Sequence, residues 1–138
     1  MSGGLSNKAR GDLSAKIRGK DVLAAFDLLV DGMDEFDVFE LSPNVLGQKK
    51  SLHFKSGKVS YFAFIANNEW LLWYFRLPGL RDGVFNFDEL KSAFPLLAFS
   101  DRAEVEKLEA VLRIRSLQDA ESVLSFVRSK VAKLASLR

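Results

Sequence analysis

The chain has 138 residues, of which 48% are hydrophobic, 28% are charged and none is cysteine, and its formal net charge is +2 at pH 7. This length and balance are typical of a folded domain and exclude an intrinsically disordered chain. The lack of cysteine excludes disulfides, thiolate catalysis and cysteine-ligated metal sites.

The N-terminal part of the chain carries two blocks of opposite charge. Residues 5–20 hold five basic side chains and one acid, whereas residues 21–40 hold seven acids and no base. Residues 1–18 also contain several Gly, Ser and Asn, so we expect a flexible basic arm there, with at most a helical turn around Leu13 and Ile17, and a single α+β domain over residues 19–138. The asymmetry suggests an electrostatic partner, although a solvated surface is the commoner explanation.

A helix is predicted from Lys20 to Met33, because apolar residues recur there at the spacing of one helical face. Three of its acids share another face, and a solvated stripe is a better interpretation of them than a metal site: Asp27, Asp31 and Asp34. A strand over residues 36–41 is expected next, and Pro43 should end it because proline cannot donate to a ladder.

Three more strands are predicted over residues 48–55, 58–66 and 69–77. The links between them, Ser56-Gly57 and Asn67-Asn68, are typical of tight two-residue hairpins because Gly and Asn tolerate positive φ. The three strands should therefore form an antiparallel meander.

A loop is predicted around Pro78-Gly79 and Asp82-Gly83, and the chain beyond it should be mainly helical. Asn86 should cap a short helix over residues 87–94, and another is expected over residues 100–107. A last strand over residues 110–115 precedes a long C-terminal helix capped by Ser116. The predicted fold class is α+β, with a mostly antiparallel sheet of about five strands flanked by N-terminal and long C-terminal helices.

The predicted hairpin registers assign the meander side chains to two faces. We expect the core on the face that carries Leu52, Phe54, Tyr61 and Leu72. The opposite face is the candidate interface or ligand face, because it combines large aromatic side chains with a polar, partly basic margin: Lys49, Ser51, His53, Phe62, Phe64, Trp73 and Phe75. Such a patch needs a cover, and the chain's own helices, a second copy and a ligand all stay open.

No motif assigns a catalytic, cofactor-binding or metal-binding residue. His53 is the only histidine, and no acid falls near it on its predicted face, so a surface role is preferred over acid–base catalysis. No glycine-rich phosphate loop precedes a helix.

The sequence leaves three classes of function open. We expect first a non-enzymatic interaction domain that binds itself as a homodimer, or another protein, through the aromatic face. The alternatives are a nucleic-acid-binding module that uses the basic arm and the same face, or a small-ligand or enzymatic pocket lined by Trp70, Trp73 and Tyr74. Without a signal peptide or a run of about 18 apolar residues, we expect a cytoplasmic protein that does not enter a membrane.

Overall fold

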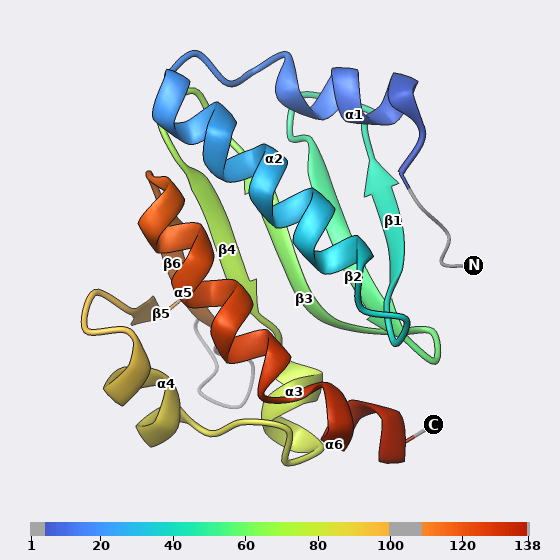
Figure 1. The fold of residues 1–138 in the computed structure, drawn as a ribbon, viewed down its shortest axis with the longest axis vertical. Helices are drawn as coiled ribbons and strands as arrows, with labels where there is room; N and C mark the ends of the chain where they lie inside the picture. Colours follow the sequence, from blue (N-terminus) through green and yellow to red (C-terminus); the bar gives the residue numbers. More distant parts are fainter. Residues whose placement is uncertain (1–4, 100–108, 138) are drawn as a thin grey trace.

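The computed structural model describes residues 5–99 and 109–137. Within them, six strands form one antiparallel sheet in the order β1-β2-β3-β4-β6-β5, accompanied by six helices (Figure 1). The α+β prediction is confirmed. The strands are β1 (Glu40–Asn44), β2 (Ser51–Ser56), β3 (Val59–Ala66), β4 (Leu71–Phe75), β5 (Ala98–Phe99) and β6 (Ala110–Ile114). The helices are α1 (Asn7–Ser14), α2 (Lys20–Asp34), α3 (Leu77–Arg81), α4 (Phe87–Ala93), α5 (Leu117–Arg128) and α6 (Val131–Ser136).

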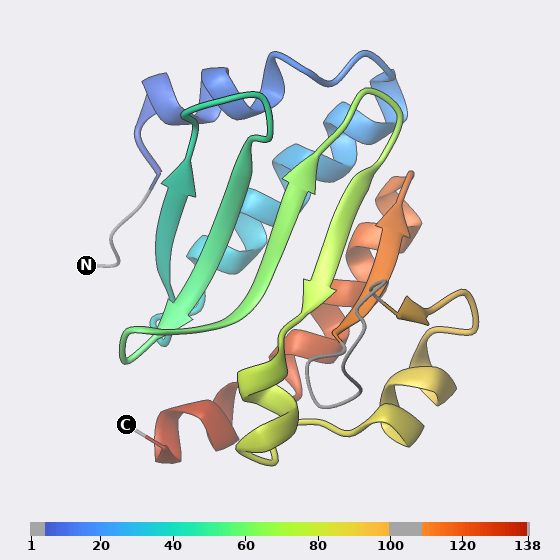
Figure 2. The ribbon, with the colours of Figure 1, turned by 180° about the vertical axis from the view of Figure 1, so that it is seen from behind.

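The two longest helices cover one face of the sheet. α2 and α5 cross it side by side, and Figure 2 shows that no described helix crosses the opposite face. Gly32 permits the close approach of these helices, because a Cβ atom there would lie 2.7 Å from Cδ1 of Leu124. The sheet thus has a covered face and an open face, and the open face carries Ser51, His53, Ala63, Ile65, Leu72, Tyr74, Val111 and Arg113.

Aromatic rings fill the space between the covered face and the two helices. Trp73 is fully buried, and its ring centroid lies 5.5 Å from that of Phe54 on the neighbouring part of the sheet. Phe26 of α2 meets Phe64 edge-on at 5.9 Å, and α5 adds the buried ring of Phe126. Edge-on and offset contacts of this kind stabilise a core beyond the burial of area alone.

The buried face is the one that we expected to form an interface. Phe62, Phe64, Trp73 and Phe75 are each 0% exposed, because α2 and α5 pack on them. The prediction that these four side chains form an intermolecular or ligand face is therefore wrong, and the chain's own helices supply their cover. Of the four side chains expected in the core, Leu52, Phe54 and Tyr61 are buried as predicted, whereas Leu72 is partly exposed.

A β-bulge explains part of this difference. The register shifts between Phe54 and Lys55, so Leu52 pairs with Phe64 and Phe54 with Phe62 on the covered face. A bulge adds one residue to one strand, and one residue is enough to exchange the faces of everything beyond it. Two-residue hairpin geometry without a bulge had placed Leu52 and Phe54 on the face opposite Phe62.

The link between β3 and β4 is longer than predicted but leaves the faces unchanged. It spans residues 67–70, so Phe64 pairs with Trp73 instead of Leu71. The amide of Asn67 donates to the carbonyl of Trp70 across the link at 3.1 Å. A shift of two residues returns each side chain to its own face.

The N-terminal residues pack against the sheet domain. α1 begins after Ser6, whose hydroxyl accepts a hydrogen bond from the Ala9 amide, and its Leu13 is 0% exposed. Ile17, four residues later, is 9% exposed and belongs to the same core. The expectation of a flexible arm is therefore wrong for residues 5–18, and residues 1–4 lie outside the described part of the chain.

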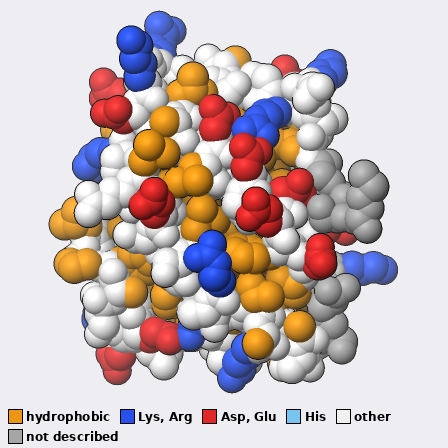
Figure 3. Space-filling model, viewed as in Figure 1, with side chains coloured by type: hydrophobic (Ala, Val, Ile, Leu, Met, Phe, Trp, Pro, Cys, Tyr) orange, Lys and Arg blue, Asp and Glu red, His pale blue; other side chains and the backbone are white. Residues whose placement is uncertain are grey.

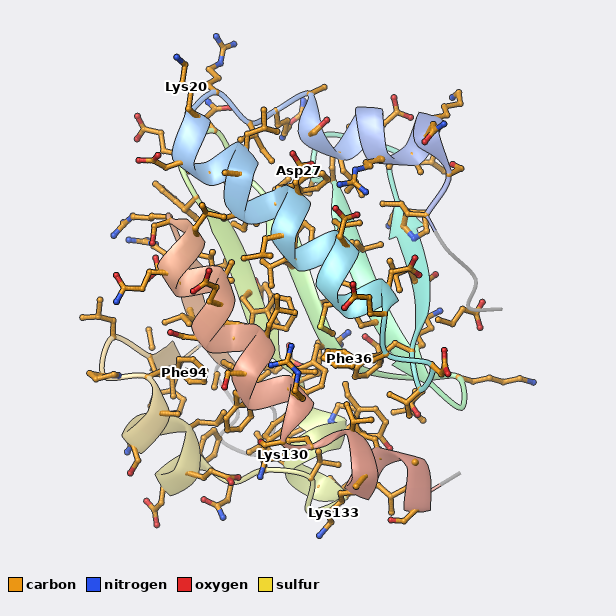
Figure 4. All side chains as sticks on the ribbon, in the orientation of Figure 1. Lys20, Asp27, Phe36, Phe94, Lys130 and Lys133 are labelled. Carbon is orange, nitrogen blue, oxygen red and sulfur yellow. The ribbon has the colours of Figure 1, made fainter. Side chains whose placement is uncertain are left out.

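The two predicted charge blocks meet each other in the fold. Arg10 of α1 donates to Asp31 at 2.8 Å and to Asp27 at 3.0 Å, and the hydrogen bond to Asp31 raises the pKa of Arg10. Asp27 is labelled on α2 in Figure 4, and Figure 3 shows further acidic side chains scattered over this helix-covered side. Part of the acidic stripe is thus matched by a basic residue of the same chain.

Several local predictions can be compared directly with the remaining elements. The Asn86 side chain accepts from the Glu89 amide and caps α4, as predicted. The first strand lies later than expected and includes Pro43, which is tolerated because β1 is an edge strand. The long C-terminal helix is interrupted near Ser129, where α5 ends and α6 follows.

Two short elements were not predicted, and one prediction has no counterpart to compare. α3 occupies a segment expected to be a loop, and the short edge strand β5 was not anticipated. The helix predicted over residues 100–107 lies outside the described residues. Among the described helices, none combines the length and apolar character needed to cross a membrane.

Candidate functional site

The open face is organised in rows of side chains that cross the sheet. One row joins Ser42, His53, Ala63, Tyr74 and Val111 on successive strands through direct cross-strand pairing. The next row places Ile65 beside Leu72. Because Ala63 is small, it leaves a depression between the larger side chains on either side of it.

Basic residues surround this apolar centre. Lys55 lies on β2, Arg76 follows the end of β4, and Arg113 and Arg115 lie on and just after β6. Lys49 precedes β2 and is exposed. Two acids accompany these bases, because Glu40 pairs with Lys55 across the strands and Glu109 lines the same face, so basic side chains are in excess there.

A polar network on this face joins His53 of β2 and Ser60 of β3 to Arg76, which follows β4, and Glu109, which precedes β6. Arg76 donates through Nε to Oε2 of Glu109 at 2.8 Å, and through Nη1 to the Ser60 hydroxyl at 3.3 Å. Nδ1 of His53 lies 2.8 Å from the Ser60 oxygen and 3.2 Å from Nη1 of Arg76. Glu109 is only 5% exposed and also accepts from the Leu77 amide at 3.0 Å. The guanidinium of Arg76 is thus fixed from two sides.

The contact with Arg76 determines the protonation state of His53. A guanidinium can only donate, so Nδ1 of His53 must accept and the ring proton resides on Nε2. Burial, and then the charges of Arg76 and Lys55, lower the pKa of His53. At neutral pH His53 is therefore an uncharged ring whose remaining N–H is a hydrogen-bond donor.

This arrangement argues against a serine nucleophile. Ser60 and His53 lie at the distance that a serine and its general base require. However, Arg76 approaches the same ring nitrogen, and the carboxylate of Glu109 bonds to Arg76. A nitrogen whose lone pair faces a cation is a poor base, so the network suits the binding of an anion better than proton abstraction.

Two hollows flank Tyr74 on the open face. The first has a volume of about 300 Å³ and is lined by Lys49, Ser51, His53, Ala63, Ile65, Tyr74, Arg76 and Glu109. The second has a volume of about 510 Å³ and is lined by Leu72, Tyr74, Leu96, Ala98, Phe99, Val111, Arg113 and Arg115. The first hollow is lined by the charged side chains of Lys49, Arg76 and Glu109, whereas the second combines two arginines with several apolar side chains. The open face therefore offers two chemically different places for a ligand.

Trp70 borders the same face in contact with arginines. The guanidinium carbon of Arg113 lies 4.7 Å from the Trp70 ring centroid, and that of Arg115 lies 5.7 Å away. Such contacts are favourable cation–π interactions. They hold the two arginines at the rim of the sheet, next to the second hollow.

The structure divides the predicted candidate residues into two groups. Lys49, Ser51 and His53 come together on the open face and line the first hollow. The four aromatic candidates lie on the covered face, as described above. The predicted pocket lined by three aromatic residues is not formed, because Trp73 is buried whereas Trp70 and Tyr74 belong to the open face.

Sequence reasoning missed the residues that fix the network. Arg76 and Glu109 are 33 positions apart, and Ser60 joins them only because the bulge after Phe54 turns it toward His53. No local pattern signals such a contact. Within the described residues, no three acids or histidines are grouped so that they could hold a metal ion.

Comparisons of the chain with protein-family models, with curated protein sequences and with solved structures gave no match. The functional argument therefore rests on the geometry of the open face.

His53 should make the stability of the fold depend on pH. Its pKa is lowered below the ordinary value of 6.5, so the unfolded chain binds a proton where the folded protein does not. The free energy of unfolding should therefore fall as the pH decreases from about 6.5 toward the folded-state pKa. His53→Gln should remove this component, as measured by urea unfolding at pH about 7.5 and about 5. Because the chain has one histidine, the same pH dependence in parent and variant would contradict the assignment.

Proposed function

We propose that this protein is a non-enzymatic binding domain whose open face binds single-stranded nucleic acid. The observation that carries the proposal is the excess of basic over acidic side chains on the open face, where Glu40 and Glu109 are the described acids beside five bases. Five basic residues lie on or beside the open face: Lys49, Lys55, Arg76, Arg113 and Arg115. Proteins that bind single strands combine a positive surface for the phosphates with exposed ring faces for the bases.

Tyr74 and Trp70 supply the aromatic part of this surface. Tyr74 lies between the two hollows, near the middle of the sheet, and Trp70 lies at its rim beside Arg113. Leu72 lies between them along the chain, and Ile65 of β3 is paired with Leu72, so both add apolar surface beside the two rings. Bases could pack along this strip while phosphates lie over the basic margin, so affinity should depend strongly on salt.

A homodimer through the same face is the main alternative, but the positive charge of the face disfavours this dimer. A two-fold contact opposes a surface to its own copy, so Arg113 and Arg115 would approach the basic residues of the partner. Exposed apolar side chains nearby, Leu96 at 84% and Phe99 at 40%, are the features that favour a protein partner. The experiment below distinguishes the two.

Binding should be measured by fluorescence anisotropy with labelled oligo-dT of about 12 nucleotides, within the usual range for one module. We expect micromolar or tighter affinity at low salt, and at least a tenfold loss in the double variant Arg113→Glu, Arg115→Glu. Trp70 provides a second signal, because Trp73 is fully buried and base stacking should quench the fluorescence of Trp70 alone.

The control reverses a charge on the helix-covered side. Lys8 of α1 has a side chain that is 89% exposed, and Lys8→Glu should leave oligo-dT binding nearly unchanged. No binding by the parent at low salt, or equal losses in both variants, would contradict the proposal. A parent that is a dimer by light scattering, and a double variant that is a monomer, would support the protein interface instead.

A further inference from the structure

The first hollow differs from the rest of the open face because its donors come from three separate segments. Lys49 lies before β2, His53 lies within β2, and Arg76 lies after β4. Ala63 and Ile65 of β3 form the floor between them. Ala63 itself is only 4% exposed, so the larger side chains around it form the walls of the hollow.

Arg76 is held in place before any ligand arrives. Its Nε donates to the buried carboxylate of Glu109, and its Nη1 faces the Ser60 hydroxyl and His53. A guanidinium that is already ordered loses little conformational entropy when it binds an anion. Glu109 in turn is occupied by Arg76 and by the amide of Leu77, so its negative charge is offset locally.

The other two donors complement this one. The Nε2–H of His53 donates without adding charge, because Nδ1 accepts from Arg76. Lys49 adds an exposed positive charge to the lining of the hollow, and it forms no ion pair with any described residue. The hollow therefore presents single donors from three directions.

This pattern selects among anions by shape. A carboxylate is planar and favours two parallel donors from one arginine, but Nε of Arg76 is bound to Glu109 and Nη1 contacts Ser60 and His53, so only Nη2 is left to donate. A phosphate group is tetrahedral, has three acceptor oxygens and can use one donor from each of several residues. We propose that the hollow between Lys49, His53 and Arg76 is a binding site for a phosphate group.

The proposal deepens the function proposed above, because the group could be one phosphate of a bound strand. A free phosphate monoester has the same chemistry and would use the same donors. The two sources are separated by the choice of probe: inorganic phosphate and a nucleoside 5′-monophosphate on one side, and oligo-dT without a terminal phosphate on the other.

The single histidine gives a direct signal from the site. We would follow the imidazole resonances of His53 by NMR while adding each probe, with sodium chloride at matched ionic strength as the control. Binding should move the resonances saturably. In the free protein, burial and the charges of Arg76 and Lys55 lower the pKa of His53, while the charge of Glu109 raises it. A bound anion would add a negative charge that stabilises the imidazolium, so binding should also raise the pKa of His53.

Two lysines on the same face provide a matched pair of variants. Lys49 lines the hollow, whereas Lys55 lies on β2 outside it. Lys49→Gln should weaken phosphate binding about tenfold, the effect of losing one charged hydrogen bond, and Lys55→Gln should leave it within about twofold. Neither side chain is buried, so both variants should melt like the parent.

The outcomes are distinct. Equal losses in the two lysine variants would mean general electrostatic attraction and would overturn the site, as would a His53 response no larger than that to chloride. If oligo-dT binds by anisotropy while His53 responds to no probe, only the phosphate site fails. If inorganic phosphate moves His53 but oligo-dT does not bind, the site stands and the nucleic-acid function fails.

Discussion

Trp73→Arg is expected to prevent folding. Trp73 is 0% exposed, and its ring lies 5.5 Å from Phe54 and 5.9 Å from Phe62 under α2 and α5. Arginine would place a charge there with no described partner, and it would also leave much of the ring volume empty. Removal of a buried tryptophan alone costs about 3–5 kcal/mol, which is comparable to the total stability of many domains. Circular dichroism and thermal melting of the purified variant would test this.

Trp73→Phe is the matched control. The buried indole Nε1 has no hydrogen-bond partner among the described residues, so phenylalanine removes an unsatisfied donor while it keeps an aromatic ring. We expect this variant to fold with a modest loss of stability. A Trp73→Arg protein that remained folded as a monomer would contradict the burial described here and would revive an intermolecular role for this face.

Leu13→Ala should destabilise the protein by about 2–5 kcal/mol, the usual cost of truncating a fully buried leucine. Leu13 is 0% exposed, and α1 is further tied to α2 by the contacts of Arg10 with Asp27 and Asp31. The measurement is urea unfolding of the full chain.

Lys8→Ala on the same helix is the reference, because the Lys8 side chain is 89% exposed and its contact with Asp12 is long, at 3.8 Å. It should unfold within about 0.5 kcal/mol of the parent. If Leu13→Ala unfolded at the same urea concentration as Lys8→Ala, α1 would be a dispensable arm.

Elements governed by local chemistry were predictable. The apolar period of α2, the Asn86 cap of α4 and the Ser116 cap of α5 each depend on residues a few positions apart, and each matches the structure. α1 was expected at most as a helical turn in a flexible arm, because its few apolar residues do not show by themselves that they pack into a core. Leu13 is buried by distant elements, which no window of local sequence contains.

The two faces of the meander could not be told apart because both are apolar. Ile65, Leu72 and Tyr74 on the open face look as hydrophobic in sequence as Phe62 and Phe64 on the covered one. The choice between them follows from the positions of α2 and α5, a tertiary feature that strand periodicity does not contain.

The candidate site was predictable only in part. Lys49, Ser51 and His53 were recognised because they alternate along one strand. Their partners Arg76 and Glu109 lie next to the ends of β4 and β6, and the contact depends on these two strands being neighbours. The sequence offers no signal for that adjacency.

The strands at the two edges of the sheet bear on how the protein behaves at high concentration. At one edge, β1 contains Pro43, which has no amide hydrogen to donate to another chain. At the other edge, β5 consists of Ala98 and Phe99 alone and pairs with residues 110 and 111 of β6, so β5 leaves only residues 112–114 of β6 unpaired on that side. Long, flat edge strands are the usual templates for strand addition and fibril growth. Neither edge of this sheet presents one within the described residues, so polymerisation by strand addition should begin from unfolded chains and not from the native fold.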